Sequence, residues 1–305
     1  MVAFAPMEKG PIRYSQAMGK RTAGAESNVA IGLAKLGKKA GWFSKLGDDE
    51  FGEYILRELR GENVDTSAVI MSRKNPTGIM FKQFSAGNET SVFYYRKGSA
   101  ASTITKEDLP LEYIKQAKIL HISGITPALS ESCKEAVFTA VQFAREQNIR
   151  VSFDPNIRLK LWCKDEAKAC LMDLLPLSDI VLIGEDEADI LLGTNDPYQT
   201  VDILRKHNVS QIAAKLGAAG AVVADQHMSY AISARPVQVV DNIGAGDAFN
   251  AGFLCALLEE KNLETCGKFG AIMGAYAVSS YGDVEGLPSR SQVNALINET
   301  QNIYR

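Results

Sequence analysis

Residues 239–253 read VVDNIGAGDAFNAGF, and this stretch decides how the rest of the chain is interpreted. Its pattern predicts the end of a strand, a glycine turn and then a helix. Gly244 and Gly246 let a ligand approach the backbone closely, and the first turn of the helix directs free N–H groups toward that ligand. The stretch therefore predicts an anion site. Asp247 has two interpretations, an acid that caps the helix or a carboxylate that does chemistry beside the anion.

Composition sets the class of protein. The chain has 305 residues, of which 46% are hydrophobic and 23% are charged, with a net charge of −3. These values are typical of a soluble globular protein and argue against a basic surface for nucleic acid. Five cysteines occur without a CxxC pair, so no disulfide framework or zinc site is indicated and a reducing cytoplasm is expected. The apolar opening is too short for a signal peptide, and no apolar run approaches membrane length.

Strands and helices alternate through the middle of the chain. The expected strands are 38–45, 118–123, 151–154 and 180–183, and the expected helices are 130–146, 166–175 and 188–192. This alternation predicts an α/β fold with a mostly parallel sheet between helices. Ligands of such sheets bind beyond the carboxyl ends of the strands, so the residues that follow each strand are candidates for a site.

Two of these strand ends, and the end of a further strand expected at 211–214, carry candidate residues. Arg158 lies in the loop after the strand at 151–154, where a guanidinium is well placed for an anion. Glu187 follows the strand at 180–183 and is either an ordinary acid of a first helical turn or a magnesium ligand acting through water. Residues 215–221 read KLGAAGA and are expected to form a glycine turn between two strands.

An earlier helix begins near residues 24–28, which read GAESN. Ser27 or Asn28 is the expected N-cap, because serine and asparagine are preferred there. The functional alternative is that Gly24 admits a ligand to the backbone while Glu26 or Asn28 hydrogen-bonds its hydroxyls. Both interpretations stay open.

Two β-rich runs, 77–84 and 90–96, are expected to form a hairpin joined by residues 85–89. Alternation places Tyr94 and Arg96 on one face, and Phe93 on the other. Large apolar side chains occupy both faces, and a two-stranded ribbon is not stable alone. The hairpin is therefore expected to pack on the main body, on a partner subunit, or on both.

The order of these motifs resembles the ribokinase-like (PfkB) sugar kinase family over nearly the whole chain. The general family motifs are GAESN at 24–28, GDDEFG at 47–52 and DNIGAGDAF at 241–249. Within the family, further segments are similar to those of kinases that act on 2-keto-3-deoxygluconate. These segments are PTG at 76–78, FYYRKGSAAS at 93–102, HISGIT at 121–126, FDPNIR at 153–158, LW at 161–162 and GDVEGLP at 282–288.

The resemblance implies a fold and an assembly. The fold would be a ribokinase-like three-layer α/β core with a mostly parallel central sheet and a small β-sheet lid. Residues 24–66 and 97–305 would form the core, and residues 5–23 and 67–96 the lid, with no separately folding domain. The lid would also form the contact of a homo-oligomer.

The resemblance further implies ATP-dependent phosphorylation of the sugar acid's terminal hydroxyl. Asp247 would accept the hydroxyl proton, while Gly244, Ala245 and Gly246 would present backbone N–H groups to the phosphoryl group. The residues expected to contact the sugar acid are Gly24, Ala25, Glu26, Asn28, Tyr94, Arg96, Arg158, Asp247 and Asp283. Those expected to contact ATP are Asn156, Arg158, Lys215, Gly217, Gly220, Gly244 and Gly246. Mg²⁺ at Glu187, through water, and a monovalent cation near Asp241 complete the implied cofactors.

The chain departs from the family pattern at three places. Relatives usually begin several residues earlier, Gly184 stands where the family places an asparagine, and a late-helix asparagine has no match around Gly270. A fructokinase-like enzyme for neutral sugars and a catalytically silent sugar-acid-binding protein therefore remain as alternatives. A dinucleotide oxidoreductase is disfavoured, because no Gly-x-Gly-x-x-Gly opens an early βαβ unit.

Overall fold

A six-stranded sheet forms the centre of the molecule, in the order β12-β11-β10-β9-β8-β7. The computed structural model describes residues 1–8, 10–84 and 90–302. Four strands are parallel, namely β7 (Ile119–Ser123), β8 (Arg150–Asp154), β9 (Ile180–Gly184) and β10 (Gln211–Lys215). Two antiparallel strands, β11 (Ala221–Ala224) and β12 (Ser229–Ile232), complete the edge beyond the predicted glycine turn. The mostly parallel sheet is confirmed.

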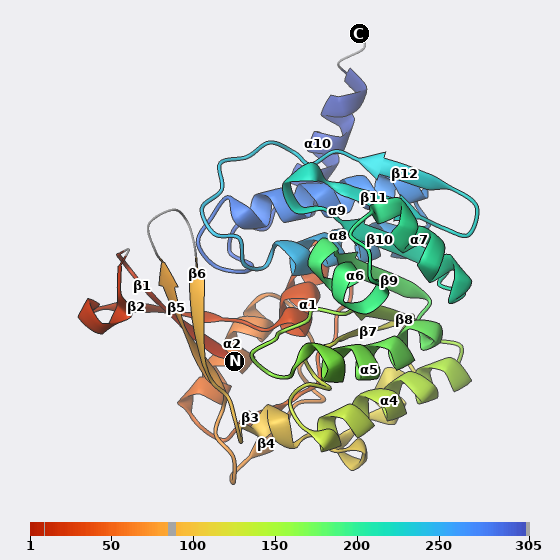
Figure 1. Cartoon of the computed structure of the whole chain (residues 1–305). Helices are drawn as coiled ribbons and strands as arrows, with labels where there is room; N and C mark the ends of the chain where they lie inside the picture. Colours follow the sequence, from red (N-terminus) through yellow and green to blue (C-terminus); the bar gives the residue numbers. More distant parts are fainter. Residues whose placement is uncertain (9, 85–89, 303–305) are drawn as a thin grey trace.

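Helices cover both faces of this sheet (Figure 1). One face is covered by α1 (Ala25–Lys35), α2 (Glu50–Gly61), α8 (Ala245–Leu258) and α9 (Leu263–Val278). The other face is covered by α4 (Glu131–Glu146), α5 (Lys164–Leu174), α6 (Glu185–Leu192) and α7 (Pro197–Lys206). The short helix α3 (Leu111–Ile114) and the late helix α10 (Arg290–Asn302) complete the set.

The sequence of β9 explains these three layers. Ile180 and Leu182 belong to the apolar cluster on one face, and Val181 and Ile183 belong to the cluster on the other. Successive strand side chains point to opposite faces, so an unbroken apolar run is buried on both sides. Such a strand requires helices above and below it.

A second sheet of four strands lies to one side of the core, in the order β2-β1-β5-β6 (Figure 1). Its strands are β1 (Val2–Pro6), β2 (Met18–Thr22), β5 (Ile79–Phe84) and β6 (Thr90–Tyr95). β5 and β6 pair antiparallel, as the hairpin prediction required, and the loop predicted at 85–89 lies outside the described residues. Met80, Lys82 and Phe84 are buried on the face of β5 toward the core, whereas Phe93 and Tyr95 of β6 are exposed on the opposite face. We call this sheet the lid sheet.

The strand predicted at 38–45 is wrong. Strand β3 covers Lys45–Gly47 and pairs in parallel with β4 (Ile70–Ser72), while Gly41 forms an isolated bridge to Asp65. The partner segment turns at residues 66–69, where the Val69 N–H donates to the Thr66 carbonyl. A turn there interrupts the ladder, so the extended chain before Lys45 has no continuous strand beside it.

Helices α1 and α8 pack at very short range. A Cβ atom on Gly32 of α1 would lie 2.5 Å from the Cβ atom of Ala251 in α8. Carbon atoms in contact are normally about 3.5–4.0 Å apart, so glycine is required where these two helices meet. This contact sets the position of the residues that both helices carry toward the carboxyl edge of the sheet.

We predict that Gly32→Ala destabilises the protein by about 1–3 kcal/mol, because overpacking outweighs the better helix propensity of alanine. The free energy of unfolding in urea measures this. Gly61→Ala is the matched control, since a Cβ atom there meets nothing within 4 Å at the end of α2. Equal stability of the wild type and the Gly32→Ala variant would contradict the packing argument.

Candidate functional site

The predicted glycine turn begins α8. Gly244 is the N-cap of the helix and has a left-handed φ of 87°. A Cβ atom on Gly244 would lie 2.7 Å from the carbonyl oxygen of Asp283, so glycine is needed for the conformation and for the close approach. The N–H groups of Ala245, Gly246 and Asp247 have no intrahelical acceptor, as in the first turn of any helix. Free N–H groups at a helix N-terminus are suited to an anion, so this geometry is consistent with the anion site that the sequence predicts.

The strand end predicted just before this turn is wrong. Residues 239–241 are irregular, and the N–H groups of Val240 and Asp241 both donate to the carbonyl of Val278, at 2.7 and 3.3 Å. Val278 is the last residue of α9, where carbonyl groups lack helical partners. The segment therefore pairs with a helix end, which satisfies its N–H groups without a neighbouring strand.

Asp247 is buried beside other acids. Its Oδ2 accepts a hydrogen bond of 2.8 Å from Nδ2 of Asn28, and its Oδ1 accepts one of 3.4 Å from Nδ2 of Asn156. Burial raises the pKa of Asp247 to about 8, with the Asp154 and Asp283 carboxylates adding to the effect. Both donors lie outside α8, which favours the chemical interpretation of this carboxylate over the helix cap.

The N-cap prediction for α1 is wrong. The helix begins at Ala25, with Gly24 as its N-cap, so Ser27 and Asn28 lie inside the first turn. Gly24 has a φ of 153°, a value that glycine adopts easily, and this lets the helix begin at the next residue. The Ser27 hydroxyl donates a hydrogen bond of 2.8 Å to the carbonyl oxygen of Gly24.

Asn28 is consequently free to act across the site. Besides its bond to Asp247, its Nδ2 lies 3.3 Å from Oδ2 of Asp283. Its own Oδ1 is buried and has no hydrogen-bond partner in the described part of the chain. A buried carbonyl oxygen without a donor is an acceptor for a ligand hydroxyl.

Glu26 and Arg96 bring opposite charges to the same region. Oε1 of Glu26 accepts bonds from the hydroxyls of Ser123, the last residue of β7, and of Thr126, at 2.6 and 2.8 Å. Burial lowers the pKa of the Arg96 guanidinium, an effect that Glu26 opposes and Arg158 reinforces. The Arg96 guanidinium also lies over the Tyr94 ring, at 5.7 Å from its centroid. The two guanidinium groups supply positive charge for an anionic ligand in a region that also holds the carboxylates of Glu26, Asp247 and Asp283.

A buried polar network underlies the start of α8. Asn250 donates to Oδ2 of Asp154 at 2.6 Å, and the Lys215 ammonium lies 3.3 Å from both Oδ1 of Asp154 and Oδ1 of Asn250. A Cβ atom on Gly246 would lie 3.7 Å from Nζ of Lys215. The Lys215 side chain therefore extends to the glycine turn, and its ammonium pairs with the Asp154 carboxylate.

Glycines shape the turn after Lys215. The turn Gly217–Ala219 joins β10 to β11, and Gly217 and Gly220 have left-handed φ values of 54° and 101°. A side chain on Gly220 would overlap the carbonyl of Ile232. The turn is thus as predicted, and its backbone lies directly after the lysine.

Glu187 is held by the backbone. Its two oxygens accept from the N–H groups of Gly184 and Ile157, at 2.7 and 3.2 Å. Burial and the nearby Asp154 carboxylate raise its pKa, while Lys215 lowers it. Within the described ranges 1–8, 10–84 and 90–302, no group of three or more histidine, cysteine, aspartate or glutamate side chains is arranged to hold a metal.

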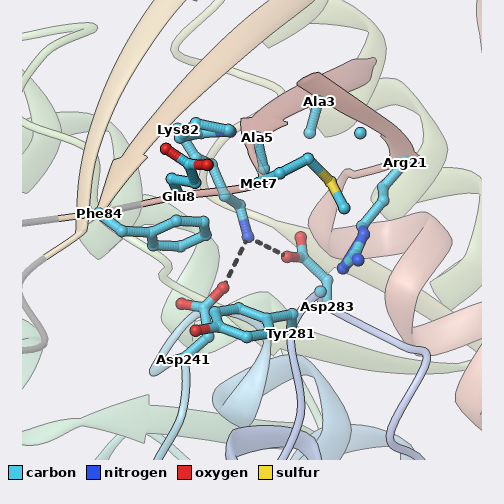
Figure 2. A pocket seen from close by; sticks show the side chains of 13 residues that line it. Ala3, Ala5, Met7, Glu8, Arg21, Lys82, Phe84, Asp241, Tyr281 and Asp283 are labelled. Atoms are coloured by element: carbon cyan, nitrogen blue, oxygen red, sulfur yellow. Dashed lines mark hydrogen bonds and ion pairs between the residues drawn. The ribbon is translucent and has the colours of Figure 1, made fainter. Parts of the chain in front are cut away.

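A cavity of about 200 Å³ lies between the lid sheet and the loop at 281–283 (Figure 2). Asp283 belongs to its wall, together with Lys82, whose ammonium pairs with Asp283 and Asp241. Sequence reasoning missed Lys82 and Asn250. The available signal for Lys82 was its place between Met80 and Phe84 on the buried face of a strand, where a lysine needs a partner.

Comparison with known proteins places the chain among sugar kinases. A family model described as pfkB family carbohydrate kinase matches residues 1–290. The 2-dehydro-3-deoxygluconokinase of Bacillus subtilis (strain 168) is 37% identical over 309 residues, covering 100% of this chain and 95% of the relative. The crystal structure of 2-dehydro-3-deoxygluconokinase from Thermotoga maritima superposes with a TM-score of 0.92 at 25% identity, covering 98% of this chain and 95% of that one.

A fructokinase is also similar. The structure from Vibrio cholerae O395, with fructose, ADP and calcium ion bound, superposes with a TM-score of 0.86 at 27% identity and covers 96% of each chain. Among residues 1–8, 10–84 and 90–302, none of the helices combines the length and the apolar character that a membrane-spanning helix requires.

We predict that the stability of the wild type relative to an Asp247→Asn variant depends on pH. The folded pKa of Asp247, about 8, exceeds its unfolded value of 3.8, so the folded protein holds a proton that the unfolded chain releases. The stability that the wild type gains from this proton is fully present below about pH 4 and is lost as the pH rises toward about 8. The free energy of unfolding in urea, measured at about pH 5 and at about pH 8, tests this. Between these two pH values the variant should become more stable relative to the wild type by several kcal/mol. A difference that does not change with pH would contradict the raised pKa.

Proposed function

Because the chain belongs to the pfkB family of carbohydrate kinases, we propose that it transfers the γ-phosphoryl group of ATP to 2-dehydro-3-deoxygluconate, also called 2-keto-3-deoxygluconate. The acceptor is the terminal hydroxyl, and the product is 2-keto-3-deoxy-6-phosphogluconate. One observation carries the proposal. The buried Asp247 carboxylate at the N-terminus of α8 shares the Asn28 amide with Asp283, in a region that also receives Arg96 from the end of the lid sheet.

Asp247 is the proposed base. It accepts the proton of the attacking hydroxyl, and the N–H groups of Gly244, Ala245 and Gly246 stabilise the charge on the transferring phosphoryl group. A base whose pKa is near the working pH combines a useful ionised fraction with good basicity. The pKa of Asp247, about 8 without ligands, is in that range.

The acceptor would bind between α1 and the lid sheet. Arg96 and Arg158 suit its carboxylate, because a guanidinium offers two parallel donors to such a group. Its hydroxyls would meet polar groups and backbone on the core side. The residues proposed for those contacts are Gly24, Ala25, Glu26, Asn28, Tyr94 and Asp283. The unpaired Oδ1 of Asn28 supports this arrangement.

ATP would lie along the carboxyl edge of the sheet, against Lys215 and the turn with Gly217 and Gly220. Asn156 and Arg158 would reach its phosphates from the loop after β8. Magnesium, when bound, would neutralise charge on those phosphates. Its proposed ligand, Glu187, has an oxygen donor of the kind magnesium prefers, but both oxygens already accept backbone N–H groups, which favours contact through water. The monovalent cation expected near Asp241 stays a prediction.

We infer that the chain forms a homo-oligomer through the lid sheet. Phe93 is 44% exposed and Tyr95 is 66% exposed on the face that points away from the core, and contiguous apolar side chains of this size commonly mark an interface. Sedimentation equilibrium tests this, and a monomer at every concentration would refute it.

The cysteines, all of them free, support a reducing cytoplasmic location.

We predict that the enzyme prefers the sugar acid over fructose, ribose and adenosine, by at least about 10-fold in kcat/KM, because neutral acceptors leave the guanidinium groups unpaired. ATP-dependent phosphorylation of each acceptor measures this preference. Arg96→Met should reduce the preference, whereas Arg57→Met, on an exposed face of α2, should not.

Two outcomes of the acceptor assay would change the assignment. A strong preference for a neutral sugar would favour a fructokinase-like enzyme. Binding of the sugar acid without turnover of any acceptor would favour the catalytically silent alternative.

We predict that Asp247→Asn lowers kcat on the order of 1,000-fold, because the amide cannot accept the proton. ATP binding, measured by calorimetry, should persist, since the backbone of α8 is unchanged. Asp48→Asn, at a half-exposed acid before α2, is the control and should keep full activity. Turnover retained in Asp247→Asn would mean that another group accepts the proton.

A further inference from the structure

Lys82 places a buried positive charge between the lid sheet and the core. Its side chain is 3% exposed and extends from the inner face of β5. Its ammonium lies 2.7 Å from Oδ1 of Asp283 and 3.2 Å from Oδ2 of Asp241, as Figure 2 shows. Burial alone would lower the pKa of Lys82, but the two carboxylates outweigh that effect and raise it. The lysine is therefore charged, and it is held entirely by residues of the core.

The two carboxylates flank the glycine turn. Asp241 precedes Gly244 by three residues, and its Oδ1 also accepts the Ile243 N–H at 3.2 Å. The backbone of Asp283 packs against Gly244 from the other side. One ammonium on the lid sheet thus contacts both supports of the turn that begins α8.

Two aromatic rings line the same cavity as Lys82. Phe84, two residues beyond Lys82 on β5, stacks at a tilt on Tyr281, with 5.5 Å between the ring centroids. Both rings line the cavity of about 200 Å³ that also contains the Lys82 side chain. Less water around the ion pairs makes each of them stronger, and makes an unmatched carboxylate more costly.

We propose that Lys82 is a positioning residue of the acceptor site, which orients Asp283 toward the sugar and fixes the glycine turn only when the lid sheet is seated on the core. This inference rests on the proposed function, since it assigns Asp283 to the acceptor. Lys82 itself contacts neither substrate. It acts through Asp283 on binding of the acceptor and through Asp241 on the anion-binding turn.

An electrostatic consequence separates this role from mere stabilisation. Asp283 and Asp154 raise the pKa of Asp247, and Arg158 lowers it. Lys82 balances the charge of Asp283, which shares the Asn28 amide with Asp247. Removing the ammonium leaves that carboxylate uncompensated near the base. The pH profile of kcat/KM should then move to higher pH.

The test compares Lys82→Ala with Lys20→Ala, a matched change of an exposed lysine on β2 of the same sheet. The acceptor is whichever sugar the wild type phosphorylates, so failure of the proposed substrate does not decide the result. We expect kcat/KM of Lys82→Ala to fall on the order of 100-fold, mainly through KM for the acceptor, with the alkaline shift in its pH profile. Lys20→Ala should behave as the wild type.

Chemical rescue sharpens the test. Ethylamine is small enough for the cavity beside Lys82. In its ammonium form it should raise kcat/KM of the Lys82→Ala variant at least about 10-fold. It should have no effect on the wild type or on Lys20→Ala. A folded Lys82→Ala enzyme whose KM stays within about twofold of the wild type, with an unmoved pH profile, would overturn the proposal.

A second variant provides the test if Lys82→Ala does not fold. Lys82→Met/Asp241→Asn removes one buried charge of each sign, so the net buried charge is unchanged. The proposal expects a raised KM for the acceptor, because Asp283 still lacks its ammonium. An unchanged KM in that double variant would overturn it.

Discussion

The contact between Gly244 and the backbone of Asp283 is the constraint on which the site depends. A Cβ atom at Gly244 would come within 2.9 Å of the Cα atom of Asp283, so the start of α8 reaches this position only through glycine. Once it is there, Asp247 and Asp283 are close enough for one amide, that of Asn28, to donate to both. The close packing of Gly32 on Ala251 brings that amide into range, because it fixes α1 against α8.

The buried acids around this contact are matched in different ways. Asp154 faces the Lys215 ammonium, and Asp241 and Asp283 face that of Lys82. Asp247 instead accepts hydrogen bonds from two neutral amides. A direct ammonium partner would lower its pKa and weaken it as a base. The arrangement therefore neutralises the acids that support the site and leaves basicity on the carboxylate proposed to use it.

Periodicity predicted much of the fold and less of the site. The parallel strands were predictable because runs such as residues 180–183 are apolar on both faces. The strand at 38–45 and the strand end before Asp241 were wrong, because each depends on whether a distant segment offers a continuous ladder. Motifs located the residues around Asp247, but Lys82 and Asn250 acquire their roles only from partners far away in the sequence. The local sequence pattern around a residue does not identify a partner that lies far away in the sequence.

Those distant pairs also link the lid sheet to the chemistry. In any conformation with β5 lifted from the core, Asp241 and Asp283 would lose the Lys82 ammonium that balances their charges. Two effects on the pKa of Asp247 would then oppose each other, because the added negative charge raises it while water that enters the opened site relieves the burial that raises it most. The arrangement of Asp283 and of the glycine turn, by contrast, depends directly on the ammonium and would be complete only beneath a seated lid sheet. Lys82 would thereby make the geometry of the acceptor site and of the anion-binding turn depend on the position of one strand of the lid sheet.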